Sequence, residues 1–144
     1  MNQILTAHTP DEMFAIGEKI ADSLHGGEVI LLYGALGAGK TLLTKGIMNG
    51  LEFDVDEVTS PSFSLVNLYK STRFDVYHID LWRLDAASNP AESVGLNEIL
   101  ENDMAVTIIE WADRLDDRSR PVPAISVCIE GDGDEPRTVA IEQS

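Results

Sequence analysis

The sequence predicts an α/β fold with a mixed central sheet flanked by helices. Apolar runs of strand length alternate with segments of helical periodicity along the 144 residues. A glycine-rich loop joins one apolar strand directly to a helix, a connection found in layered α/β proteins. The hydrophobic fraction is 44%, and no repeat or low-complexity linker divides the chain. We therefore expect a single domain over residues 1–144.

The first predicted helix begins with a capping box. Thr9 can cap the helix, Pro10 suits the first helical position, and Glu12 stands three residues after the cap. Apolar residues then recur at helical spacing until the glycines at 26–27 end the helix. Residues 28–33 are almost continuously apolar, which predicts a buried strand that leads into the glycine-rich loop.

The rest of the chain continues this alternation. A second helix follows the loop and ends near Gly50. After an acidic loop over 54–61, alternating apolar and polar residues predict a half-buried strand that forms a hairpin with the next one. The remaining predicted elements are strands over 63–69 and 75–81, a helix over 91–100, a buried strand over 104–110, and closing strands over 124–130 and 137–142.

Charge and hydropathy exclude several classes of protein. The formal net charge is −15, so we expect no direct high-affinity nucleic-acid binding, which depends largely on Lys and Arg. The acidity fits either a solvated surface or a field that steers the chain to a basic partner. No stretch approaches the ~20 apolar residues of a spanning helix, and the N-terminus lacks a secretory signal. We expect a cytoplasmic protein without membrane contact.

Cys128 is the one cysteine of the chain and lies in an apolar run over residues 124–129. A single cysteine cannot form an intrachain disulfide. A reactive thiol needs an electropositive, accessible setting, which this run does not offer. We expect a buried strand residue without a chemical role.

The glycine-rich loop carries the strongest functional signal, because residues 34–41 match the P-loop pattern G-x-x-x-x-G-K-[ST]. Its glycines let backbone N–H groups and the start of the following helix point at a phosphate. Lys40 is predicted to reach the β- and γ-phosphates, and the Thr41 hydroxyl to bind Mg²⁺. The predicted fold is thus that of a P-loop NTPase. Its predicted nucleotide-binding residues in this region are Gly34, Leu36, Gly37, Ala38, Gly39, Lys40, Thr41 and Leu42.

Two acids, Asp80 and Glu110, each follow an apolar strand. Mg²⁺ prefers oxygen ligands, and in P-loop enzymes a carboxylate at the end of a neighbouring strand supports its coordination shell. Spacing alone does not rank the two acids. We expect one of the two acids to serve the metal and the other to position water. The alternative is that either acid is simply a strand-end residue in solvent.

Two residues near Asp80 each have two interpretations. His78 shares a strand face with Asp80. The absence of metal-ligand spacing around it favours a hydrogen-bonded packing histidine. Arg83 fits either an arginine finger, which stabilises charge on a transferred phosphoryl group, or a surface ion pair.

Four motifs in this order resemble the bacterial tRNA threonylcarbamoyladenosine biosynthesis ATPase family, TsaE (the YjeE family). They are residues 36–41 of the P-loop and the segments 60–67, 78–84 and 109–111. The capping-box helix and a late strand at Arg137 also fit, so the likeness covers essentially the whole chain. It implies a single-domain α/β fold that binds ATP and Mg²⁺ at the loop.

The resemblance also implies roles for individual residues. These are catalysis by Lys40 and Asp80, metal binding by Thr41 and Glu110, and nucleotide contacts by Trp111 and Arg137. The segment 60–63 resembles a switch-like loop near the γ-phosphate, and a buried anchor is a comparable interpretation of Trp111. The chain departs from the family pattern at Ala35 (often Asp), Ser62 (usually Thr) and Trp82 (commonly Tyr). Because phosphate contacts come from backbone N–H groups, we do not expect Ala35 to remove activity.

The function implied by this resemblance is ATP binding and hydrolysis in tRNA N6-threonylcarbamoyladenosine (t6A) biosynthesis. The chain would act on the TsaD–TsaB complex and sustain its turnover, as an ATPase that is weak alone and stimulated by its partner. One alternative is a P-loop small-molecule kinase, with Asp80 as the base that accepts a hydroxyl proton. Another is a nucleotide-gated interaction module, in which ATP orders the loop over 54–66 for a partner.

Overall fold

The computed structural model describes residues 2–35, 37–58, 65–70, 74–84 and 89–143. Its strands form one seven-stranded sheet in the order β1-β7-β6-β2-β5-β4-β3. They are β1 (Gln3–Ala7), β2 (Val29–Gly34), β3 (Val66–Tyr69), β4 (Val76–Asp80), β5 (Val106–Glu110), β6 (Ile125–Glu130) and β7 (Arg137–Gln143). The β6–β2, β2–β5 and β5–β4 pairs are parallel, and the β1–β7, β7–β6 and β4–β3 pairs are antiparallel. The predicted α/β fold with a mixed central sheet is confirmed.

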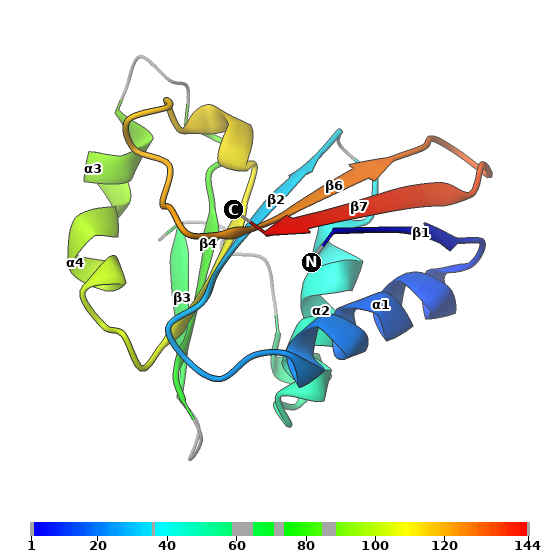
Figure 1. Cartoon of the computed structure of the whole chain (residues 1–144), viewed down its shortest axis with the longest axis horizontal. Coiled ribbons are helices and arrows are strands. Elements are labelled where there is room, and N and C mark those ends of the chain that lie inside the picture. The colour runs from blue at the N-terminus through cyan, green and yellow to red at the C-terminus, as the bar shows by residue number, and fades with distance from the viewer. Residues whose placement is uncertain (1, 36, 59–64, 71–73, 85–88, 144) are drawn as a thin grey trace.

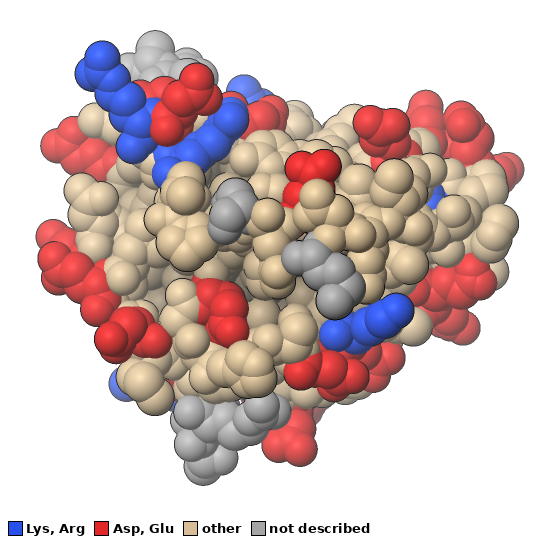
Figure 2. All heavy atoms as spheres, in the orientation of Figure 1, with Lys and Arg blue, Asp and Glu red and all other residues tan. Residues whose placement is uncertain are grey.

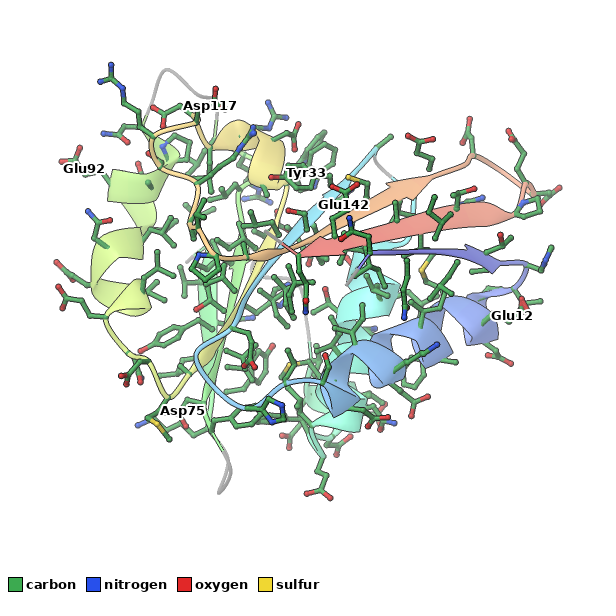
Figure 3. The ribbon with its side chains drawn as sticks, in the orientation of Figure 1. Glu12, Tyr33, Asp75, Glu92, Asp117 and Glu142 are labelled. Carbon is green, nitrogen blue, oxygen red and sulfur yellow. The ribbon has the colours of Figure 1, made fainter. Side chains whose placement is uncertain are left out.

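Two helices, α1 (Pro10–Asp22) and α2 (Lys40–Gly50), lie side by side on one face of the sheet (Figure 1). The predicted N-cap forms at α1, where the Thr9 hydroxyl accepts from the N–H of Glu12 at 3.1 Å. The Glu12 carboxylate, at the first turn of α1 in Figure 3, accepts from the N–H of His8 at 2.8 Å. In a capping box the Glu12 carboxylate would bond to the N–H of the cap, Thr9, whereas here it bonds to the residue before the cap.

Glycines bring α1 and α2 into close contact. A Cβ atom at Gly46 would lie 2.1 Å from the backbone oxygen of Phe14, and one at Gly17 would lie 2.3 Å from that of Leu43. Neither separation is possible between real atoms, and a helix backbone does not move aside as the end of a side chain can. This contact fixes the position of α2, whose first turn carries Lys40.

Replacing Gly46 with alanine is expected to lower the free energy of unfolding by about 2–3 kcal/mol. The melting temperature should fall by on the order of 8 °C. In an uncrowded helix the same substitution stabilises, because glycine loses more entropy on folding than alanine, so the sign of the change tests the close contact. Circular dichroism during thermal unfolding measures it. Lys45→Ala in the same helix is the control, and an unchanged or raised melting temperature for Gly46→Ala would contradict the packing.

The opposite face of the sheet is covered by α3 (Pro90–Val94) and α4 (Leu96–Leu100) (Figure 1). The prediction of one continuous helix over 91–100 is wrong. Gly95 adopts a left-handed φ of 68° and separates the two helices. Glycine takes this conformation at the least cost and commonly ends helices.

Strand β1 lies outside the elements predicted from the sequence. It is an edge strand that pairs antiparallel with β7, joining Gln3 to Ile141. Ile4 is 77% exposed, Leu5 is partly buried against the core and Ala7 is buried, so only one face of the strand contributes apolar surface to the core. The strand is defined by its pairing with β7, at the far end of the chain, and its five residues alone do not predict a strand.

Cys128 is exposed, so the prediction of a buried residue is wrong. Alternate side chains of a strand point to opposite faces, and in β6 Val127 and Ile129 take the core positions. Partial burial, followed by the carboxylates of Glu142 and Glu130, raises the pKa of the Cys128 thiol. The thiol therefore stays protonated at neutral pH, which agrees with the expectation that it has no chemical role.

Acidic side chains are spread over the visible face of the molecule (Figure 2). This distribution agrees with the interpretation of the net charge of −15 as a solvated surface. Over the part of the chain that the structure describes, no helix has the length and apolar character needed to cross a membrane.

Candidate functional site

The glycine-rich loop lies between the end of β2 and the start of α2. Gly37 and Gly39 have φ angles of 80° and 116°, a conformation that favours glycine. Gly39 is the N-cap of α2 and offers no side chain to the first N–H groups of the helix. These donors, together with the positive end of the helix dipole, are available to an anion. The loop has the geometry of a phosphate-binding site. Leu36 lies outside the described residues.

Lys40 lies across this loop. Its side chain is 5% exposed, and its Nζ donates to the carbonyl oxygens of Gly34 at 2.5 Å and Ala35 at 2.9 Å. The same Nζ is 3.9 Å from the centre of the Trp111 ring. Burial lowers the pKa of Lys40, and neighbouring carboxylates, Glu110 first, act in the opposite direction. A partly dehydrated ammonium group at this place is stabilised by an anionic ligand.

Thr41 and Glu110 place two side-chain oxygens next to each other, beside Lys40. The Thr41 Oγ1 donates to Glu110 Oε1 at 3.3 Å. Glu110 is the last residue of β5 and is 2% exposed. Hydroxyl and carboxylate oxygens are ligands that Mg²⁺ prefers. Among the described residues, no group of three or more His, Cys, Asp or Glu side chains could hold a metal by itself. The pair therefore fits an Mg²⁺ ion that takes its other ligands from phosphate and water.

Asp80 lies directly beside Glu110. The two acids are register partners at the ends of the parallel strands β4 and β5, so their side chains share one face of the sheet. The Asp80 Oδ1 accepts from the N–H of Trp82 at 2.9 Å. Partial burial raises the pKa of Asp80, the bond from Trp82 opposes this rise, and the charge of Glu110 adds to it. The structure thus brings together the two strand-end acids that the sequence singles out.

One pocket of about 400 Å³ contains these groups. It is lined by Gly37, Gly39, Lys40, Thr41, Leu42, Asp80, Trp82, Glu110 and Trp111. The rings of Trp82 and Trp111 lie against each other at a tilt of 40°, with their centres 4.4 Å apart, and the Arg114 guanidinium lies 5.6 and 5.5 Å from those centres. Trp111 has a φ of 59°, a costly conformation that often marks functional sites. Trp82 is not among the site residues predicted from the sequence. Its position two residues after Asp80 is the signal that could have identified it.

His78 is fully buried, and its Nε2 lies 2.5 Å from Glu110 Oε2. The sequence predicts a hydrogen-bonded packing histidine here, but not that its partner is Glu110. Arg83 is exposed and does not line the pocket, so its position does not support an arginine finger. The predicted switch-like segment 60–63 lies outside the described residues.

A second pocket, of about 340 Å³, adjoins the first along the loop. The two share lining residues of the loop and of α2. Arg137, the first residue of β7, lines the second pocket. It donates to the carbonyl oxygens of Ala38 at 3.2 Å and Gly133 at 3.1 Å. Arg137 therefore ties the loop to the turn between β6 and β7.

The buried strand, the glycine-rich loop, the helix that begins at Lys40 and the strand-end acids together define the P-loop NTPase fold. Residues 7–139 match the family described as "Threonylcarbamoyl adenosine biosynthesis protein TsaE". The chain belongs to this family.

Several relatives carry the name tRNA threonylcarbamoyladenosine biosynthesis protein TsaE. The protein of Bacillus subtilis is 33% identical over 130 residues, which cover 90% of this chain and 78% of that protein. The protein of Haemophilus influenzae is 37% identical over 117 residues, or 76% and 72% of the two chains. The protein of Nostoc sp. is 39% identical over 105 residues, or 69% of this chain. This chain spans 62% of the Nostoc protein and 63% of the related Synechocystis protein.

A solved structure supports the same fold. The crystal structure of Bacillus subtilis YdiB superposes with a TM-score of 0.77 at 28% sequence identity. The match covers 98% of this chain and 84% of YdiB. The arrangement of the sheet and helices is thus shared over nearly the whole chain.

Proposed function

We propose that this chain binds ATP with Mg²⁺ at the glycine-rich loop and hydrolyses it, as a component of t6A biosynthesis. The proposal is carried by the Thr41–Glu110 oxygen pair, 3.3 Å apart, in one pocket with Lys40 and Asp80. A phosphate cradle alone would support only anion binding. The oxygen pair adds a place for a metal, and Asp80 adds a second acid. Membership in the TsaE family supports the pathway.

Each group has a distinct task in this proposal. The N–H groups of the loop and of the first turn of α2 bind the phosphates, and Lys40 moves from its carbonyl partners to the β- and γ-phosphates. Thr41 and Glu110 would hold Mg²⁺, which when bound would neutralise charge on the phosphate oxygens. Asp80 orients the attacking water. The adjoining rings of Trp82 and Trp111 restrict access of other water to the pocket.

The nucleoside part of ATP is assigned to the second pocket, next to Arg137. This pocket continues from the phosphate site along the loop and has about 340 Å³ of space. The bonds from Arg137 to Ala38 and Gly133 hold its wall against the loop. Arg137 then contributes to nucleotide binding chiefly by fixing the backbone around the phosphates.

The cations near the phosphate site support a need for a partner. Among the described residues that line this pocket, Lys40 is the one cation, and none is an arginine. Arg114 lies over the tryptophan rings, and Arg137 is bonded to backbone. An arginine supplied in trans accelerates phosphoryl transfer by about 10³-fold or more. We therefore propose that hydrolysis is slow in the isolated chain and faster on the TsaD–TsaB complex.

Phosphate release from MgATP, measured with and without TsaD–TsaB, tests this proposal. The isolated chain should turn over slowly, and the complex should accelerate it by about 10³-fold or more. Lack of acceleration would refute the partner role. Product analysis separates the alternatives. A kinase would yield a phosphorylated acceptor in place of free phosphate, whereas a nucleotide-gated module would bind ATP without repeated turnover.

Asp80→Asn is expected to reduce turnover by about 100-fold or more without loss of stability. Because burial raises the pKa of Asp80, the folded chain binds this proton more tightly than the unfolded chain. Ionised Asp80 therefore costs stability, and this cost appears as the pH rises through the range between the two pKa values. Asparagine cannot ionise, so Asp80→Asn does not carry this cost. The melting temperature of Asp80→Asn should therefore exceed that of the wild type, and by more at about pH 7 than at about pH 4. A melting temperature clearly below that of the wild type at about pH 7 would contradict this account.

A further inference from the structure

We infer that His78 is a positioning residue that holds the Glu110 carboxylate in the orientation required for Mg²⁺ binding. The inference rests on the proposed function, because it concerns the metal of that site. His78 does not line the phosphate pocket and is not expected to touch nucleotide or metal. It acts through Glu110.

The two side chains meet across neighbouring parallel strands. The register pairs His78 with Ile108 and Asp80 with Glu110, so the imidazole reaches diagonally to the carboxylate. His78 Nε2 lies 2.5 Å from Glu110 Oε2, and we assign the proton of this hydrogen bond to Nε2 because a carboxylate only accepts. The side chains of His78 and Glu110 are 0% and 2% exposed. Water therefore does not compete for this hydrogen bond.

The bond divides the two oxygens of Glu110 between two neighbours. Oε2 is bonded to His78, whereas Oε1 lies 3.3 Å from the hydroxyl of Thr41. With Oε2 engaged, Oε1 is left for a metal on the Thr41 side. Mg²⁺ demands near-ideal octahedral geometry, so a carboxylate fixed in one rotamer binds it better than one free to rotate. His78 thus selects one oxygen and one orientation.

Packing alone does not explain a histidine at this position. Its Nδ1 is buried and has no hydrogen-bond partner among the described residues. A buried polar atom without a partner is unfavourable, and an apolar side chain of similar size would avoid that cost. The neighbouring core positions Ile79 and Ile108 are indeed apolar. What the histidine provides, and an apolar residue cannot, is the bond to Glu110.

A matched pair of amide substitutions tests this role. In His78→Gln the side-chain amide can reach the position of Nε2, whereas in His78→Asn it reaches only that of Nδ1. Calorimetry measures the affinity of each variant for the nonhydrolysable ATP analogue AMPPNP. The measurement is made at a series of Mg²⁺ concentrations and repeated in EDTA. His78→Asn should weaken the apparent Mg²⁺ affinity of the AMPPNP complex by about 10- to 100-fold. Affinity in EDTA should be unchanged, and His78→Gln should recover most of the loss.

The outcomes separate this inference from the proposed function. A wild-type Mg²⁺ affinity in His78→Asn, or equal losses in both folded variants, would overturn the positioning role and leave the proposed ATPase intact. If Mg²⁺ does not affect AMPPNP binding in the wild type, the metal site itself fails, and this inference fails with it. Turnover of MgATP by the wild type is measured separately and reports on the proposed function.

A second measurement needs no substitution and does not depend on a variant that folds. In the wild-type protein with ¹⁵N-labelled histidine, the Nε2 resonance of His78 should shift when Mg²⁺ is added to the AMPPNP complex, because the metal withdraws charge from the carboxylate that accepts its proton. The resonances of His8 and His25 are internal controls. A His78 resonance that does not respond to Mg²⁺ would overturn the inference.

Discussion

Lys40→Ala is expected to weaken ATP binding by about 100-fold or more and to abolish detectable hydrolysis. Lys40 is a cation of 5% exposure at the loop where the phosphates would bind. Its Nζ already bonds to the carbonyl oxygens of Gly34 and Ala35, so a phosphate replaces neutral acceptors with charged ones. A hydrogen bond to a charged group contributes about 1.5–3 kcal/mol, and two such bonds correspond to a factor of about 100 or more. Calorimetric titration with MgATP measures the change.

Lys45→Ala is the matched control for this substitution. It removes the same charge from the same helix, α2, at a residue that does not line the phosphate pocket. Its ATP affinity should stay within about 2-fold of the wild type, because Lys45 does not line the phosphate pocket and salt screens charges that are not in contact with the ligand. An affinity of Lys40→Ala that equals that of Lys45→Ala would refute the placement of the phosphates at this loop.

Glu110→Gln is expected to reduce Mg²⁺-dependent turnover by at least about 100-fold, because the metal stabilises transition-state charge by several kcal/mol. The substitution keeps the size of the side chain and removes its charge. Nucleotide affinity measured in EDTA should be unchanged, since the loop and Lys40 still contact the phosphates. Titration of Mg²⁺ into the reaction should show that higher concentrations recover part of the rate.

Glu130→Gln provides the comparison for Glu110→Gln. Glu130 is also a glutamate at the end of a strand, β6, but it is exposed and does not line the phosphate pocket. Its turnover should remain at the wild-type level. Wild-type turnover in Glu110→Gln would contradict the assignment of this residue to the metal.

The predictable parts of the fold are those whose signals are local. The capping box at Thr9 and Glu12, and the apolar run that becomes β2, depend on residues close together in sequence. Strand β1 depends on pairing with β7 at the opposite end of the chain. The helix break at Gly95 depends on a backbone conformation that a helical pattern of apolar residues does not reveal. Tertiary context decided the first of these features, and the local backbone conformation of Gly95 decided the second.

The same distinction applies to the site. The glycine-rich loop with Lys40 and Thr41 is a contiguous motif, so its position could be predicted. The meeting of Asp80 and Glu110 required only that parallel strands end at the same edge of a sheet. The bond between His78 and Glu110 depends on the strand register, which the sequence does not specify. The exposure of Cys128 depends on which face of β6 is covered, which is again a property of the assembled sheet.

A crystal structure of this chain with Mg²⁺ and AMPPNP tests the central claim most directly. The account predicts phosphates bound by the N–H groups of residues 37–42, with Lys40 on the β- and γ-phosphates. It also predicts a metal in contact with the Thr41 hydroxyl and with Oε1 of Glu110, while Oε2 remains bonded to His78. Phosphates bound away from this loop, or a metal held without Thr41 and Glu110, would contradict it.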